Sequence, residues 1–283
     1  MKENPGNFTK ERRFADQKDI SFRNETNIIS WIHRWGFSSV KILNFILGLN
    51  QTSTISTIEK HEKIVREKTY VNGLHHVYHL TATGLMIAES RTDDDFEYPE
   101  IFKEKVVTSH FFHDLYTQAL TAIAVKRSVC AEFATPRMAG NSGKEDKKIP
   151  DVIWASESNS MIAIEVELNQ KVDKKLDNFM GMIIESIESG SIAECLIVTP
   201  SKATLKNYTK QLDRKIIPIW TRKSGGVWRL EREVTVRKVA TARISIVLVP
   251  EEDMDKTLRR LEVSGDMELW LAERSGSKNS SLD

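Results

Sequence analysis

Residues 149–171 read IPDVIWASESNSMIAIEVELNQK, and two runs within them, DVIWA and MIAIEVEL, are rich in β-branched and apolar residues. The turn-forming sequence SESNS separates the runs, so the stretch predicts two strands joined as a hairpin. Successive side chains of a strand point to opposite faces of a sheet, so Glu165 and Glu167 are expected to share one face. The apolar residues between them are expected to face the core on the other side.

Helical and strand patterns alternate around this hairpin. A helical apolar repeat over residues 106–126 and the strand CAEFAT precede the hairpin. The hairpin is followed by a helix over 172–189, the strand ECLIVTP, a helix over 202–214 and the strand IIPIW. Further β structure over 227–251 and a helix over 254–274 follow. The order α-β-β-β-α-β-α-β predicts an α/β (α+β) domain over residues 105–274, with helices on both faces of a mixed sheet. Residues 275–283 are expected to form a disordered tail.

Residues 24–91 predict a second, smaller domain, preceded by a flexible polar arm over residues 1–23. Two apolar helical repeats separated by Gly36 predict the first two helices, and a third helix is expected to begin at QTSTIS. The sequence VREKTYV-NG-LHHVYHL then has the pattern of a hairpin with a two-residue turn. The phrase LTATG, residues 80–84, resembles the end of the wing in MarR-like proteins. This order is that of a winged helix-turn-helix, whose third helix enters the major groove of DNA.

A recognition helix of this kind places hydroxyl groups against bases and phosphates, and cations against the backbone. The residues expected to contact DNA there are Thr52, Ser53, Thr54, Ser56, Thr57, Lys60 and Lys63. Taken alone, the segment also fits an ordinary capped surface helix. Its place between two helices and a hairpin favours the DNA-binding interpretation.

Three acidic residues of the hairpin are candidates for catalysis. Asp151 begins its first strand, and Glu165 and Glu167 lie on its second strand, so the three carboxylates are expected to gather at one edge of the sheet. Carboxylates crowded together repel one another, and a divalent cation, Mg²⁺ or Mn²⁺, relieves the repulsion and activates water. Lys171 follows and would orient that water. The alternative is that the face is solvated, or that Lys171 and Lys174 merely pair with the glutamates.

A Pro-Asp pair followed by Glu-x-Glu and a nearby Lys, on an α-β-β-β-α-β core, resembles the PD-(D/E)XK nuclease superfamily. The resemblance implies that Asp151, Glu165 and Glu167 hold the metal ion, and that Lys171 replaces the usual lysine, whose position Glu167 occupies. With a MarR-like winged helix in front, the chain resembles MobC-type conjugative relaxases and the wider replication-relaxation family. The sequence His-Asp-Leu at residues 113–115 is similar to that family as well.

One position departs from the relaxase pattern. The resemblance places an arginine and a nucleophilic tyrosine where this chain has Lys175 and Leu176. Lys175 keeps the positive charge and is expected to contact DNA, but Leu176 cannot attack a phosphodiester. Tyr208 and Tyr116 are the substitutes considered, and the spacing supports neither strongly. Hydrolysis by water and binding without cleavage therefore both stay open beside a covalent mechanism.

Bulk composition narrows the setting of the protein. The 283 residues carry 41 basic and 40 acidic side chains, so any basic surface must arise from local arrangement rather than from net charge. The first residues, MKENPGNFTKERRF, do not contain the apolar core of a signal peptide, and no apolar run is long enough to span a membrane. Cys130 and Cys195 show no metal-ligand spacing. These features predict a cytoplasmic protein.

Three classes of function fit these patterns. The first is a metal-dependent endonuclease or atypical relaxase that nicks DNA in plasmid or mobile-element mobilisation. The second is a non-catalytic, sequence-specific DNA-binding accessory factor or transcription regulator with a degenerate nuclease fold. The third is a ligand-sensing transcription factor. The expected partners are double-stranded DNA, single-stranded DNA at a nick, a second copy in a homodimer and mobilisation proteins, with no membrane partner.

Overall fold

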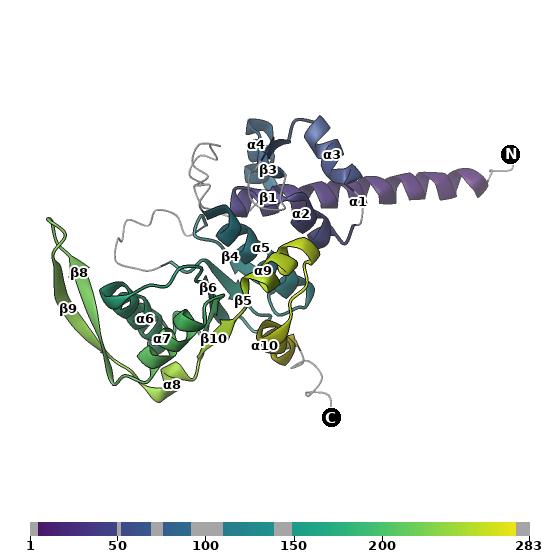
Figure 1. Cartoon of the computed structure of the whole chain (residues 1–283). Coiled ribbons are helices and arrows are strands. Elements are labelled where there is room, and N and C mark those ends of the chain that lie inside the picture. The colour runs from purple at the N-terminus through teal and green to yellow at the C-terminus, as the bar shows by residue number, and fades with distance from the viewer. Residues whose placement is uncertain (1–4, 50–51, 69–75, 92–109, 139–148, 276–283) are drawn as a thin grey trace, which may run out of the picture. The chain divides into compact units, whose positions relative to one another are not determined.

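The computed structural model describes residues 5–49, 52–68, 76–91, 110–138 and 149–275 (Figure 1). The fold is mixed α/β, and the chain divides into two compact units, residues 1–111 and 112–283. The expected domain boundary, between residues 91 and 105, lies outside the described residues. So do the turn of the predicted hairpin, residues 72–73, and nearly all of the predicted tail.

The first unit combines helices with a small antiparallel sheet of order β1-β3-β2. Its elements are α1 (Pro5–Trp35), β1 (Ser38–Ser39), α2 (Val40–Leu47), α3 (Ser53–Lys60), β2 (Ile64–Lys68), β3 (His76–Leu80) and α4 (Ala82–Arg91). Residues 5–23, which were expected to form part of a flexible arm, belong to the 31-residue helix α1. Lys, Arg, Glu, Gln and Ala are good helix formers even where no apolar face marks a helix, and they are common in this segment.

The ends of α2 are set by its sequence. The Ser39 hydroxyl accepts a hydrogen bond from the backbone N–H of Ile42 at 3.3 Å, as an N-cap residue does. Gly48 ends the helix with φ 65°, a left-handed conformation that glycine adopts without a steric penalty. Both ends of α2 are therefore explained by residues next to the helix in the sequence.

The LTATG phrase forms a tight junction between α4 and the chain that follows α3. The Thr81 hydroxyl donates to the carbonyl of Glu62 at 2.5 Å and accepts from the N–H of Gly84 at 3.1 Å. The N–H of Thr81 donates to the carbonyl of Lys63 at 3.1 Å. A Cβ atom at Gly84 would lie 1.9 Å from that same carbonyl oxygen, so only glycine fits there.

The second unit contains a five-stranded sheet of order β10-β7-β6-β5-β4. Its elements are α5 (Phe111–Lys126), β4 (Glu132–Ala134), β5 (Val152–Ala155), β6 (Met161–Val166), α6 (Asp173–Glu188), β7 (Glu194–Thr199), α7 (Lys202–Leu212), β8 (Ile216–Arg222), β9 (Trp228–Thr235), α8 (Lys238–Thr241), β10 (Ile244–Leu248), α9 (Glu251–Arg260) and α10 (Gly265–Ser275). β4, β5 and β6 are antiparallel neighbours, whereas β7 runs parallel to β6 and to β10. The sheet is therefore mixed, as predicted.

Helices cover both faces of this sheet. On one face, Trp154 of β5 is fully buried, donates to the Thr121 hydroxyl of α5 at 3.0 Å and packs near Trp270 of α10. On the other face, α6 and α7 pack over β6, β7 and β10 in one apolar cluster. Because β6 contributes alternate residues to the two faces, its odd-numbered positions lie beneath α6 and α7.

Two predictions for the end of this unit are wrong. The strand IIPIW was expected in the main sheet, but β8 pairs with β9 in a separate two-stranded sheet, and β10 is the outer parallel strand instead. Ile217 and Ile219 are buried against α6, and this contact produces the same apolar pattern as burial in a sheet. The single helix expected over residues 254–274 is two helices, because Leu261 adopts a left-handed conformation with φ 55°.

Candidate active site

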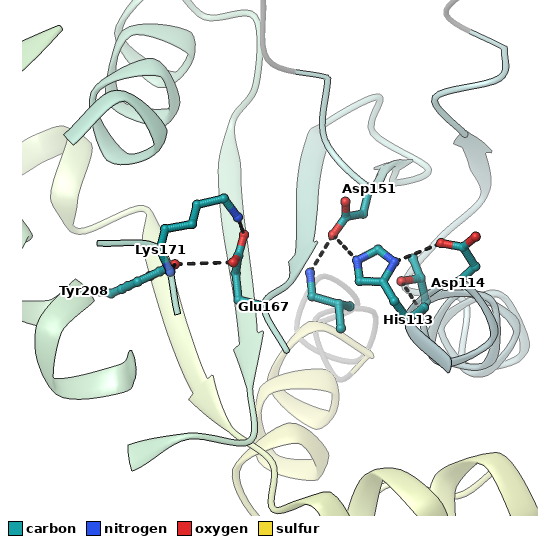
Figure 2. A network of polar contacts seen from close by, with 8 residues as sticks. His113, Asp114, Asp151, Glu167, Lys171 and Tyr208 are labelled. Atoms are coloured by element: carbon teal, nitrogen blue, oxygen red, sulfur yellow. Dashed lines mark hydrogen bonds and ion pairs between the residues drawn. The ribbon is translucent and has the colours of Figure 1, made fainter. Parts of the chain in front are cut away.

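The Asp151 carboxylate is anchored to two neighbouring elements just before β5 begins. Its Oδ2 atom accepts a hydrogen bond from the backbone N–H of Val166, at the end of β6, at 2.7 Å. The same oxygen lies 3.0 Å from Nε2 of His113, near the start of α5. Nδ1 of His113 lies 2.9 Å from a carboxylate oxygen of Asp114, so the ring bridges two acids (Figure 2).

The histidine of this bridge is a cation at neutral pH. Burial acts to lower the pKa of His113, but its hydrogen bonds to Asp114 and Asp151 and the charges of both acids outweigh that effect and raise the pKa to about 10. The imidazolium therefore donates from both nitrogens. Asp151 is thus held by a positive charge on α5 as well as by the backbone of β6.

Glu165 and Glu167 share the face of β6 that α6 and α7 cover, as the alternation predicts. Both are buried, with 2% and 5% of their surface exposed. Glu167 forms an ion pair with the Lys171 ammonium, and its other oxygen accepts from the Tyr208 hydroxyl of α7 at 3.3 Å. The same hydroxyl accepts from the backbone N–H of Lys171 at 3.2 Å, which closes the network in Figure 2.

The tyrosines considered as nucleophiles lack the exposure and the lowered pKa that a nucleophilic phenol needs. Tyr208 and Tyr116 are completely buried. Burial and the charge of Glu167 raise the pKa of the Tyr208 phenol above its usual range, and burial raises that of Tyr116 in the same way. Leu176 is buried as well. Tyr208 instead links Glu167 to the backbone of Lys171 and so fixes their positions.

A cavity of about 480 Å³ opens beside Glu165, between the sheet and α6. Apolar side chains such as Ile153 and Ile183 line part of it, and Ser186 and Ser189 of α6 and the segment after it line another part. Glu185, paired with Arg232 of β9 at 2.8 Å, lies at its rim. A small polar group therefore has space to approach Glu165 from this side.

The expected gathering of three carboxylates is not observed. Among the described residues, no group of three or more His, Cys, Asp or Glu side chains is arranged to hold a metal ion. Asp151 is directed to His113 of α5, whereas Glu165 and Glu167 lie on the face that α6 and α7 cover. Protein cations already balance Asp151 and Glu167, so in this arrangement the donor set does not fit Mg²⁺ or Mn²⁺.

The residues predicted to contact DNA are mostly at the surface. On α3, Ile55 and Ile58 are buried while Ser53, Ser56, Thr57 and Lys60 are exposed, with Thr52 exposed just before the helix and Thr54 half-buried. Lys63 differs, because its ammonium lies 2.6 Å from Glu25 of α1 in a half-buried ion pair. Lys175 is exposed near the start of α6.

The roles of three residues of the site were not predicted from the sequence. His113 and Asp114 were noted only through the family resemblance, and Tyr208 only as a nucleophile. His113 lies 38 residues from Asp151, and Tyr208 lies 41 from Glu167, so no local spacing reveals either contact. The one available signal was a His-Asp pair at the start of a helix in a domain with a candidate acidic site.

None of the described helices is long and apolar enough to cross a membrane. No protein-family model, curated protein or solved structure matches the chain. The function is therefore argued from the arrangement of the residues alone.

Proposed function

We propose that this chain is a cytoplasmic DNA-processing protein, in which the first unit binds duplex DNA as a winged helix and the second cleaves a DNA strand. The proposal keeps Asp151, Glu165, Glu167 and Lys171 as the residues of the cleavage site, with Asp151 positioning the end of β6. It assigns strand cleavage to the end of β6, where Glu167 and Lys171 meet.

The proposal of DNA binding is supported by the element order of the first unit. The elements follow one another as α1, β1, α2, α3, β2 and β3, and the three strands form a sheet of order β1-β3-β2, an arrangement that fits a winged helix. The exposed side of α3 carries hydroxyl groups and Lys60, while its apolar residues are buried. Such a face suits contacts with bases and phosphates.

One observation carries the proposal of cleavage. The elements α5, β4, β5, β6, α6 and β7 follow the order α-β-β-β-α-β, with an antiparallel meander and a final strand parallel to the third. Within it, Asp151 precedes the middle strand, and a buried glutamate pairs with a lysine at the end of the next. This combination of topology and charge supports the proposal of a PD-(D/E)XK-like domain.

Hydrolysis by water fits the residues better than covalent attack by tyrosine. The described tyrosines, Tyr78, Tyr116 and Tyr208, are all buried, and Tyr70 and Tyr98 lie outside the described residues. Water can reach the cavity beside Glu165, and the Lys171 side chain is 33% exposed, so it can face a phosphate as well as Glu167. In this proposal Lys171 stabilises the charge that develops on the phosphate oxygens.

A second candidate function is DNA binding without cleavage. It is favoured by the pairing of Asp151 with His113 and of Glu167 with Lys171, which leaves no ready metal site among the described residues. In that case the second unit would hold DNA or a second copy of the chain. The two candidates share the winged helix and differ only in what the acids do.

Nicking of supercoiled plasmid by the full chain tests the proposal. Wild type, Glu165→Gln and the control Glu188→Gln are compared with Mg²⁺, with Mn²⁺ and with EDTA. Glu188 lies at the far end of α6 in a surface pair with Arg237, so its loss removes an acid without touching the site. Nicking that Glu165→Gln abolishes and Glu188→Gln retains is the expected result, and the comparison with EDTA shows whether a divalent cation takes part.

Other outcomes separate the alternatives. Duplex binding with no nicking under any condition establishes the non-catalytic candidate. Protein covalently attached to a DNA end would contradict hydrolysis by water. The candidate nucleophiles would then be Tyr70 and Tyr98, which lie outside the described residues. Nicking that persists in EDTA would support cleavage and show that it does not need a divalent cation.

A further inference from the structure

The β8–β9 hairpin is an addition to the α-β-β-β-α-β core. It lies between α7 and α8 in the chain and forms its own two-stranded sheet. In Figure 1 it extends away from the five-stranded sheet, alongside α6. Only its base contributes to the apolar core, through Ile217, Ile219 and Val234.

The hairpin is hydrogen-bonded to the N-terminal half of α6. The Asn178 side chain donates to the carbonyl of Trp220 and accepts from its N–H, both at 2.7 Å, so the amide pairs with β8 as a neighbouring strand would. The Trp220 ring donates to Asp177 at 3.1 Å. A Cβ atom at Gly181 would lie 2.4 Å from Ile219, so helix and hairpin are in close contact.

Beyond Trp220 the hairpin is basic and exposed. Residues 220–230, WTRKSGGVWRL, contain Arg222, Lys223 and Arg229 and no acidic residue. All three cations are exposed, and none forms an ion pair with another described residue. In the strand register Arg222 pairs with Trp228, so Arg229, the next residue along β9, points to the opposite face of the ribbon.

The basic segment of the hairpin begins near the candidate site, at Trp220. The Lys174 ammonium lies 4.7 Å from the centre of the Trp220 ring, and Lys174 is only three residues from Lys171. The turn begins at Lys223, three residues beyond Trp220, so the tip reaches about 10 Å past this contact at the usual rise of a strand. Lys175 is exposed on the same turn of α6.

We infer that the β8–β9 hairpin is a DNA-binding arm that inserts into a groove of the duplex beside the cleavage site. The major groove of B-DNA admits a two-stranded β-ribbon. Cations on both faces of such a ribbon meet the phosphates of both strands that border the groove. This inference rests on the proposed function, because it takes DNA as the substrate of the second unit.

The salt dependence of duplex binding by the full chain tests the arm. Each phosphate contact contributes about 0.9 to the slope of log K against log salt, so R222A/K223A/R229A should lower the slope by about 2.7. Between roughly 50 mM and 200 mM salt, wild type should then lose about 40-fold more affinity than the variant. R222K/R229K keeps the charges and should keep the slope of wild type.

A matched control removes the same charge elsewhere. Lys202, Lys206 and Lys210 are exposed on α7, and K202A/K206A/K210A should leave the slope close to that of wild type. Equal losses in both triple variants would show that general positive charge, not the hairpin, is responsible, and would overturn the inference. Unchanged urea midpoints confirm that the variants fold.

The remaining outcomes distinguish this inference from the proposed function. Duplex binding with an unchanged slope in R222A/K223A/R229A overturns the arm and leaves the DNA-processing proposal intact. A reduced slope in R222A/K223A/R229A, with no nicking by wild type, would support DNA binding by the hairpin and contradict the proposal of strand cleavage. Absence of duplex binding by wild type overturns both, and hairpin-dependent binding to anionic lipid vesicles instead would identify a different partner.

Discussion

Replacing Gly84 with alanine tests the junction that fixes α3 against α4. The added Cβ atom would lie 1.9 Å from the carbonyl oxygen of Lys63, whereas an ordinary contact begins at 3.4 Å. The neighbour is backbone and cannot rotate away, so α4 must retreat by more than 1 Å. That movement weakens the hydrogen bonds of Thr81 to the carbonyls of Lys63 and Glu62, at 3.1 and 2.5 Å.

The magnitude follows from three contributions. Overpacking costs about 1–3 kcal/mol, and the weakened hydrogen bonds cost about 1 kcal/mol more. Alanine regains about 1 kcal/mol through its better helix propensity. Gly84→Ala is therefore expected to destabilise the first unit by about 2 kcal/mol, which lowers the melting temperature of a domain of this size by about 10 °C.

Hydrogen exchange followed by mass spectrometry separates the two units, which a global melting curve does not. Amides of β3 and α4 should exchange faster in Gly84→Ala, while those of the five-stranded sheet should stay as in wild type. Thr83→Ala is the control, because Thr83 is the exposed neighbour in the same turn. Protection in Gly84→Ala equal to that of wild type would refute the close contact with Lys63.

Three further predictions concern charged side chains and the exposed side of α3. Lys171→Met leaves the buried Glu167 carboxylate without its cation and should cost about 3 kcal/mol, whereas Glu167→Gln leaves a partly exposed lysine that reaches water and should cost about 1 kcal/mol. Urea unfolding of both variants and of the double variant, which should cost less than their sum, measures the coupling. Hydrogen bonds from Arg127 lower the pKa of Glu268, so this pair stabilises the fold above the unfolded pKa of about 4.3 and ceases to do so as the pH falls through the lower folded value. The stability difference between wild type and Glu268→Gln should thus vanish in acid titrations followed by circular dichroism. Ser56→Asp puts a negative charge on the exposed side of α3 and should weaken duplex binding about tenfold in fluorescence anisotropy without changing the urea midpoint.

Local patterns predicted the parts of the fold that local physics determines. The hairpin of β5 and β6 follows from strand alternation and a turn, and the placement of Glu165 and Glu167 on one face follows from the two-residue period. The β8 strand shows the limit of this reasoning. A short apolar run indicates that its side chains are buried. The sequence does not say whether they are buried by a neighbouring sheet or by a helix such as α6.

The candidate site was predictable in its residue types and not in its contacts. The acids and Lys171 stand within 21 residues of one another, so the sequence brought them together as a group. Which cation pairs with Asp151 depends on how α5 packs against the sheet, and His113 is remote in sequence. The expected three-carboxylate cluster failed for that reason.

The two polar networks differ in how readily they can open. A carboxylate removed from water needs a counter-cation, and His113 and Lys171 supply one each. Asp151 is held at one oxygen by both an imidazolium and the N–H of Val166, so moving it breaks two charge-assisted hydrogen bonds. Lys171 sits on a long flexible stem with a third of its side chain exposed, so it can leave Glu167 for a phosphate at lower cost. Chemistry at this site is therefore expected at Glu165, Glu167 and Lys171, with Asp151 and His113 as positioning residues that fix the end of β6.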